Sequence, residues 1–138
     1  MLKMKESISN LDKETLIKYR VSRAKETIKE AQVAIDNRLL FNAENRIYYA
    51  IFYIVSALSI KFDFSTSKHK QLMGWFNKNI VHSGKVPVRL NEIYKNALKY
   101  RQKGDYEDYV QFEINDVEKH YKDMLYFVSE IEKLIEKE

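Results

Sequence analysis

The sequence of 138 residues contains no cysteine, one proline and three glycines. Without cysteine, the chain has no disulfide bonds, no thiolate metal ligands and no thiol nucleophile. Because proline and glycine are scarce, few positions oblige a helix to end. Lys, Glu, Leu, Ile and Ala are plentiful instead. This composition predicts a nearly all-helical fold.

Long apolar runs are also absent. A membrane-spanning helix needs about 20 consecutive apolar residues. The longest apolar segment, residues 47–60, is shorter, contains tyrosines and serines, and is typical of a buried core helix. The N-terminal residues lack the apolar stretch of a signal peptide. We therefore expect a cytoplasmic chain without membrane contacts, with the length of a single domain.

Most signatures of enzymes are missing as well. The sequence has no P-loop, no glycine-rich dinucleotide loop and no His-Glu-x-x-His pair. His69, His82 and His120 lie in different segments without the spacing of metal ligands, so we expect neither a metal nor a cofactor. His69 stands where a helix is predicted to start, which favours a local capping or surface role. His120 borders a predicted helix interface, which favours a structural role.

Five segments repeat apolar residues at spacings of three and four, the period of an amphipathic helix. Residues 40–61 are apolar on almost every side and are predicted to form the central helix. Because the connections are short, we expect an antiparallel bundle with an up-and-down four-helix core. The domain is predicted to occupy residues 12–138, after a tail at 1–11. The predicted helices are residues 12–37, 40–61, 68–81, 88–103 and 115–138.

Several polar residues and glycines indicate where these helices begin and end. Asp12 is expected to cap the first helix. Gly84 suits the turn before the fourth helix, and Gly104 is expected to end that helix. Asn115 and Glu118 have the spacing of a capping box at the start of the last helix.

Charge is distributed unevenly along the chain. Residues 1–103 hold 20 basic and 9 acidic residues, whereas residues 104–138 hold 4 basic and 11 acidic residues. One interpretation is that the basic part attracts the phosphates of RNA or DNA. The other is that the acidic last helix packs beside the basic first helix and neutralises it. The sequence alone leaves both open.

One arginine lies in phase with an apolar helical stripe. Arg101 follows Leu90, Tyr94 and Ala97 at spacings of four, three and four residues, so it is predicted to face inward. A guanidinium in that position keeps its charge and needs a partner, and Asn45 on the central helix is a candidate. One interpretation is a buried Asn–Arg–Tyr network that fixes the helix register. The other is a polar pocket that holds a phosphate.

Four segments, residues 19–27, 43–53, 67–70 and 100–106, resemble in order and spacing those of the HEPN domain (higher eukaryotes and prokaryotes nucleotide-binding). The resemblance covers residues 12–135. It implies a helical bundle that forms a homodimer and is often paired with a minimal nucleotidyltransferase in a toxin–antitoxin system. Active members of the family are metal-independent endoribonucleases. Their signature is an arginine followed, after four to six residues, by a histidine that moves a proton.

The sequence departs from this signature after Arg101. The positions at which the histidine would stand hold Tyr106, Glu107 and Asp108. A tyrosine with a pKa near 10 is a poor base at neutral pH. A carboxylate could act only if burial raised its pKa, and the segment here is acidic and loop-like. The family's usual proton carrier is therefore missing.

The resemblance also suggests roles for other residues near this motif. Arg101, as the remaining catalytic-motif residue, would bind phosphate or nucleotide together with Asn45 and Lys103. Tyr106 and Tyr109 stand where a partner nucleotidyltransferase modifies a tyrosine in some relatives. The alternative for both tyrosines is aromatic packing of the loop against the bundle.

Three functional hypotheses follow, and they leave open whether the chain is an enzyme. The first is a non-catalytic or weakly active component of a toxin–antitoxin-type pair that binds RNA or a nucleotide beside a minimal nucleotidyltransferase. The second is a metal-independent endoribonuclease toxin with an atypical acid–base group. The third is a dimeric scaffold with no nucleic-acid role, in which Arg101 and Asn45 are purely structural.

Overall fold

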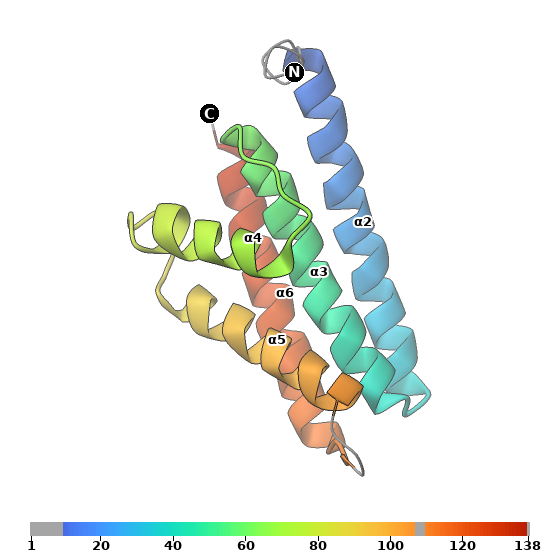
Figure 1. Cartoon of the computed structure of the whole chain (residues 1–138). Coiled ribbons are helices and arrows are strands. Elements are labelled where there is room, and N and C mark those ends of the chain that lie inside the picture. Colours follow the sequence, from blue (N-terminus) through green and yellow to red (C-terminus); the bar gives the residue numbers. More distant parts are fainter. Residues whose placement is uncertain (1–9, 107–109, 138) are drawn as a thin grey trace.

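The computed structural model describes residues 10–106 and 110–137 of the chain. Within these ranges the chain forms five α-helices and one π-helical segment, and no strand (Figure 1). The predicted all-α fold is confirmed, and the central helix has its predicted ends. The elements are α2 (Asn10–Asp36), α3 (Leu40–Lys61), α4 (His69–Phe76), η1 (Asn77–Val81), α5 (Arg89–Tyr106) and α6 (Ile114–Glu136).

Four of the helices form the up-and-down core that the sequence predicted. Along the chain, α2, α3, α5 and α6 alternate in direction, so the start of α2 and the end of α6 lie at the same end of the bundle (Figure 1). The short α4 and η1 cross in front of this core. The last turns of α5 lie beside the first half of α3, where Gly104 adjoins the Phe41 ring, and the first turn of α4 also approaches α3.

Helix α3 is the centre of the bundle, as its apolar sequence predicted. Thirteen of its residues are buried. Three of them, Ala43, Ala50 and Ala57, recur every seven residues and are fully buried. Ala24 and Ala31 have the same spacing in α2. Such small side chains allow two helix backbones to approach closely, which explains the long antiparallel α2–α3 pair.

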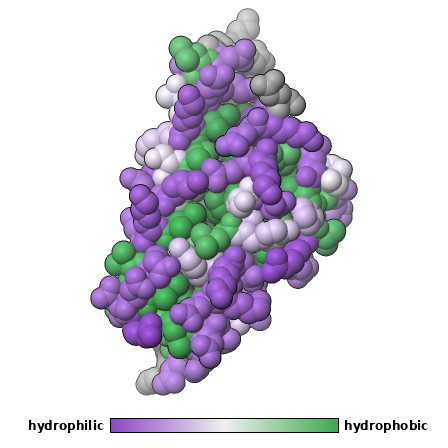
Figure 2. Space-filling model, turned by 180° about the vertical axis from the view of Figure 1, so that it is seen from behind, coloured by the Kyte–Doolittle hydropathy of each residue, from purple (hydrophilic) through white to green (hydrophobic). Residues whose placement is uncertain are grey.

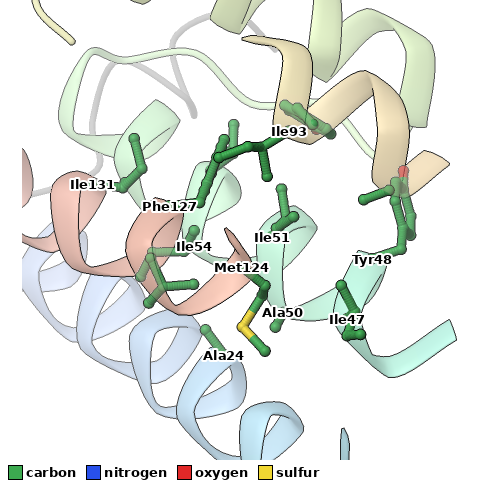
Figure 3. Close-up of a cluster of buried hydrophobic side chains, with 14 of the residues drawn as sticks. Ala24, Ile47, Tyr48, Ala50, Ile51, Ile54, Ile93, Met124, Phe127 and Ile131 are labelled. Atoms are coloured by element: carbon green, nitrogen blue, oxygen red, sulfur yellow. The ribbon is translucent and has the colours of Figure 1, made fainter. Parts of the chain in front are cut away.

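An aromatic cluster joins the crossing helix α4 to the four-helix core. Phe76 from α4, Tyr94 from α5 and Phe127 from α6 are fully buried. Their ring centroids lie 5.4 to 5.8 Å apart. Figure 3 shows Phe127 among apolar side chains of α3, with Met124 and Ala24 facing each other below it. This packing fixes the position of α4 and α5 against α3.

The predicted end of α5 and the predicted start of α2 are wrong. α5 continues to Tyr106 rather than ending at Gly104. Gly104 instead gives room to the Phe41 ring, which a Cβ at this position would overlap. Asp12 lies in the first turn of α2 and not at its cap.

The last helix begins with a different cap from the expected capping box. α6 starts at Ile114, and Glu113 is its N-cap residue without a side-chain cap hydrogen bond. The turn before α5 does follow the prediction, because Gly84 adopts a φ of 81°, which suits glycine. Residues 1–9 of the predicted tail lie outside the described residues, and the remaining two, at positions 10 and 11, belong to α2.

The acidic last helix does contact basic residues of other helices. Lys25 of α2 pairs with Glu132 of α6 at 3.0 Å, and Arg89 of α5 pairs with Asp123 of α6 at 2.7 Å.

The face seen in Figure 2 is largely polar, with apolar residues in a broken central band. None of the helices in the described part of the chain is long and apolar enough to cross a membrane.

Candidate functional site

Arg101 lies near the end of α5 and faces α3, as its place in the apolar stripe predicted. Its side chain is only 16% exposed. The guanidinium lies 5.0 Å from the centre of the Tyr48 ring and 5.6 Å from that of Tyr49. Nε donates to Asp105 at 3.3 Å, and Nη1 donates to the Tyr49 hydroxyl at 3.5 Å. These two hydrogen bonds are long, so the cation is only weakly paired.

His69 lies beside the same two tyrosines. Its Nδ1 is 2.7 Å from the Tyr48 hydroxyl, and its ring stacks on Phe52 with centroids 4.3 Å apart. The ring also meets Tyr49 edge-on at 5.7 Å. Burial lowers the pKa of His69, and the charge of Arg101 lowers it further. The imidazole is therefore neutral at pH 7.

The sequence-based interpretation of His69 as a capping or surface residue missed this position. Its closeness to Arg101 depends on how the loop 62–68 returns α4 across the middle of α3, which no helical periodicity encodes. The signal that could have found it was the resemblance of residues 67–70 to a family segment. A weak local motif far from Arg101 in sequence still needs the fold to connect it to the site.

Three arginines and two tyrosines line up along one side of α3. The guanidinium of Arg46 pairs with Glu30 at 3.0 Å and lies 5.2 Å from the Tyr49 ring, on which Arg101 also lies. One turn later, Arg23 of α2 lies 4.6 Å from the Tyr53 ring and donates to its hydroxyl at 2.8 Å. We call this group the arginine–tyrosine strip. In it, three cations lie on two half-buried aromatic rings that neighbour each other, with centroids 5.9 Å apart.

Two other predicted site residues lie differently from expectation. The side-chain oxygen of Asn45 accepts hydrogen bonds from Arg46, at 3.0 Å from Nε and 2.7 Å from Nη2. The described residues show no hydrogen bond between Asn45 and Arg101, so the network interpretation lacks a direct contact between these two. Lys103 follows Arg101 by two residues, about 200° around the helix, so its side chain leaves from another face of α5.

The two tyrosines proposed as modification sites are largely beyond what the structure describes. Tyr106 is the last residue of α5, and only its place in the helix is described. Tyr109 lies outside the described residues. Both therefore remain sequence-based predictions.

A second polar pair lies deep between α3 and α6. The Glu44 side chain is 1% exposed, and its Oε2 is 2.7 Å from Nδ1 of His120. The His120 ring packs on Tyr100 with centroids 4.3 Å apart. Oε1 of Glu44 has no hydrogen-bond partner in the described structure. His120 thus has the structural contacts expected from its place at the helix interface.

Burial makes Glu44 sensitive to pH. Desolvation raises the pKa of Glu44, an effect that the nearby Asp116 charge reinforces and that His120 opposes. Because the folded pKa is raised, the stability contributed by protonation is present below the unfolded pKa and is lost as pH rises through the folded pKa. A buried carboxylate with an unpaired oxygen then destabilises the fold.

We therefore expect Glu44→Gln, which imitates the protonated carboxyl, to gain stability relative to the wild type as pH rises from 4 to 8. The difference in Tm should grow by a few degrees, since about 1 kcal/mol corresponds to roughly 3–5 °C for a domain of this size. Thermal unfolding followed by circular dichroism measures it. Glu14→Gln, at an exposed position of α2, is the matched control. A Tm difference that stays constant with pH would contradict the assignment.

Metal ligands do not gather at either place. Among the described residues, no group of three or more His, Asp or Glu side chains is arranged to hold a metal ion. The groups around Arg101 are a weakly paired cation, a neutral imidazole, tyrosine hydroxyls and aromatic faces. This set suits the binding of a phosphate with a stacked ring beside it.

Comparisons with known proteins identify a domain family and several relatives. The family model of the HEPN domain matches residues 17–136. A protein of Thermotoga maritima named UPF0332 protein is 40% identical over 125 residues, which cover 91% of this chain and 95% of the relative. Two proteins of Methanocaldococcus jannaschii named "Putative toxin" are 26% and 27% identical. Their matches cover 71% and 72% of this chain, and 67% and 75% of theirs.

Proposed function

Because this chain belongs to the HEPN domain family, we propose that it is the RNA-binding, toxin-type component of a cytoplasmic pair with a minimal nucleotidyltransferase. It acts as a homodimer, and RNA phosphates bind at Arg101. The observation that carries the proposal is the weakly paired Arg101 guanidinium over two tyrosine rings. A bound phosphate would replace the long hydrogen bonds to Asp105 and Tyr49 with shorter, charge-assisted ones.

The arginine–tyrosine strip supports RNA as the ligand rather than a single nucleotide. Proteins that bind single-stranded RNA combine a track of cations for the phosphates with aromatic rings on which bases stack. Arg101, Arg46 and Arg23 supply such a track, and Tyr49 and Tyr53 lie between them. Each stacked base adds about 1–3 kcal/mol in such sites. The strip thus offers three cations and two aromatic rings to an RNA strand.

The toxin-type role rests on the relatives. Two of them carry the word toxin in their names. Pairing with a nucleotidyltransferase and homodimer formation are what HEPN membership leads us to expect. The family's catalytic histidine is absent from positions 106–108, so the proposal itself covers binding and not cleavage.

RNA binding is tested by its dependence on salt. We expect the logarithm of the association constant of a fluorescent single-stranded RNA to fall linearly with the logarithm of salt concentration, by about 0.7 per phosphate contact. Arg46→Ala and Arg23→Ala should each reduce this slope by roughly that amount. Fluorescence anisotropy at several salt concentrations measures it. Arg89→Ala, which removes an arginine at the start of α5 and outside the arginine–tyrosine strip, should leave the slope unchanged. Equal slopes in all four proteins would contradict the proposed strip.

The partner is tested separately, by co-expression with a minimal nucleotidyltransferase encoded beside this chain. We expect the two proteins to elute together in size-exclusion chromatography. With nucleoside triphosphate added, the peptide containing Tyr106 and Tyr109 should gain mass, and a Tyr106→Phe, Tyr109→Phe double variant should not. Separate elution together with an unmodified peptide would overturn the pairing and leave the RNA-binding proposal in place.

A further inference from the structure

His69 is the histidine that shares its surroundings with Arg101. Both side chains contact the rings of Tyr48 and Tyr49, Arg101 at 5.0 and 5.6 Å and His69 at 5.6 and 5.7 Å. The other two histidines lie elsewhere: His120 pairs with Glu44, and His82 is exposed after η1. A phosphate on Arg101 would therefore lie against His69 as well.

We propose that His69 of α4 is the catalytic proton carrier of an RNA-cleaving site centred on Arg101, and that it replaces the histidine missing from the motif after Arg101. The inference rests on the proposed RNA binding and adds a reaction to it. His69 stands 32 positions before Arg101 in the chain. The proton carrier therefore comes from α4, and the cation comes from α5.

The contacts of His69 leave one ring nitrogen available. Nδ1 is held by the Tyr48 hydroxyl at 2.7 Å, and the ring is stacked parallel to Phe52 within 13°. Nε2, on the opposite edge of the ring, has no hydrogen-bond partner among the described residues. An imidazole oriented through one nitrogen and unpaired at the other is the arrangement that general acid–base catalysis needs.

Tyr48 is the positioning residue of this pair. Its side chain is fully buried, and burial raises the pKa of its hydroxyl well above the ordinary value. The hydroxyl therefore keeps its proton at any physiological pH. Its oxygen can accept a hydrogen bond from Nδ1–H of His69, which leaves the lone pair on Nε2 and also stabilises the imidazolium once Nε2 has taken a proton.

The reaction is an internal transesterification of RNA. Nε2 of His69 takes the proton of a ribose 2′-hydroxyl while the 2′-oxygen forms a bond to the adjacent phosphorus. The bond from phosphorus to the 5′-oxygen breaks, that oxygen takes a proton from water, and His69 returns its proton to the solvent. The products are a 2′,3′-cyclic phosphate and a 5′-hydroxyl. Arg101 stabilises the negative charge that grows on the non-bridging oxygens.

The groups around His69 favour its base form. Arg101 faces it from α5, with Asp105 as the partner of that cation, and Tyr48 and Tyr49 face it from α3. On α4 itself, the neighbouring lysines are exposed. Burial and the Arg101 charge both lower the pKa of His69. We therefore expect the cleavage rate to rise with pH through an apparent pKa below 6.5 and to level off above it.

A purely structural His69 is the competing interpretation, and two isosteric variants separate it from catalysis. In His69→Asn, the amide occupies the place of Nδ1 and can keep the hydrogen bond to Tyr48, but nothing replaces Nε2. In His69→Gln, the amide reaches the place of Nε2 but cannot act as a base at neutral pH. His82→Asn is the matched control, because His82 is exposed and lies directly after η1, away from α4's first turn.

The experiment incubates the purified full-length protein with a 5′-fluorescent single-stranded RNA in EDTA and follows cleavage by gel electrophoresis. We expect cleavage by the wild type, with 2′,3′-cyclic phosphate ends, and no cleavage of an RNA with 2′-deoxy nucleotides. His69→Asn and His69→Gln should each cleave at least about 100-fold more slowly, the usual contribution of a general base. Their affinity for the RNA should stay within threefold of the wild type, and His82→Asn should cleave normally.

Each other outcome has a definite meaning. RNA that is bound but stays intact with the wild type overturns the inference and leaves the proposed function standing. Cleavage at the wild-type rate by His69→Asn overturns it too. Absence of RNA binding removes the proposed function, and the inference falls with it. Should both His69 variants unfold, the pH profile of the wild type decides, and a rate independent of pH between 4.5 and 8 overturns the inference.

Discussion

Replacing Arg101 with alanine is expected to weaken RNA binding by about 10- to 100-fold, because a charge-assisted hydrogen bond to phosphate contributes roughly 1.5–3 kcal/mol. The loss should be similar for RNAs of different sequence, since a phosphate contact carries no base information. Fluorescence anisotropy with two unrelated single-stranded RNAs measures it.

The fold should tolerate this change. The ion pair of Arg101 with Asp105 is long and partly exposed, and such pairs contribute about 0–1 kcal/mol. The Arg101→Ala protein is therefore expected to melt within several degrees of the wild type. Arg89→Ala, on the same helix, should bind RNA normally. Arg101→Lys should bind with intermediate affinity, because lysine keeps the charge but lacks the planar guanidinium.

The Arg101→Ala variant also distinguishes the scaffold hypothesis from the RNA-binding hypothesis. If Arg101 is only a structural clamp between α5 and α3, its loss should lower the melting temperature strongly and leave RNA affinity unchanged. A stable Arg101→Ala protein that no longer binds RNA would exclude that hypothesis.

Replacing Phe127 with alanine is expected to destabilise the protein by about 3–5 kcal/mol, the range for a fully buried aromatic residue. Phe127 lies between Phe76 of α4 and Tyr94 of α5 at 5.4 and 5.8 Å, so its loss leaves a cavity among three helices. A loss of this size is a large part of the stability of a typical domain.

Urea unfolding measures the effect as a lower midpoint with an unchanged slope. Leu125→Ala is the matched control, because Leu125 lies on the same helix but is 39% exposed. It should cost less than about 1 kcal/mol. A Phe127→Ala protein as stable as the control would show that the aromatic cluster does not hold α4 and α5 in place.

The sequence predicted the helical fold better than the residues at which individual helices end. Apolar periodicity over 40–61 placed both ends of α3 correctly, because the burial of a helix on all sides leaves a strong pattern. Gly104 misled the prediction of the end of α5. A glycine is usually a sign of a helix end, whereas this one makes room for a ring from α3.

The candidate site was predicted only in part. Periodicity along α5 correctly turned Arg101 inward, since helical phase is a local property. The partners of Arg101 are set by packing between helices. Asn45 lies on the expected helix but contacts Arg46, and His69 reaches the site through a loop that crosses α3. Contacts of this kind depend on how helices are placed in space, which spacing along one chain does not specify.

The central claim is that Arg101 holds an RNA phosphate beside His69. Its most direct test is a crystal structure of the protein with a single-stranded RNA whose 2′-hydroxyls are methylated, so that it cannot be cleaved. We expect a phosphate within hydrogen-bonding distance of the Arg101 guanidinium, with Nε2 of His69 facing the adjoining 2′-oxygen. An RNA bound to another face, with Arg101 still contacting only Tyr48, Tyr49 and Asp105, would contradict the claim.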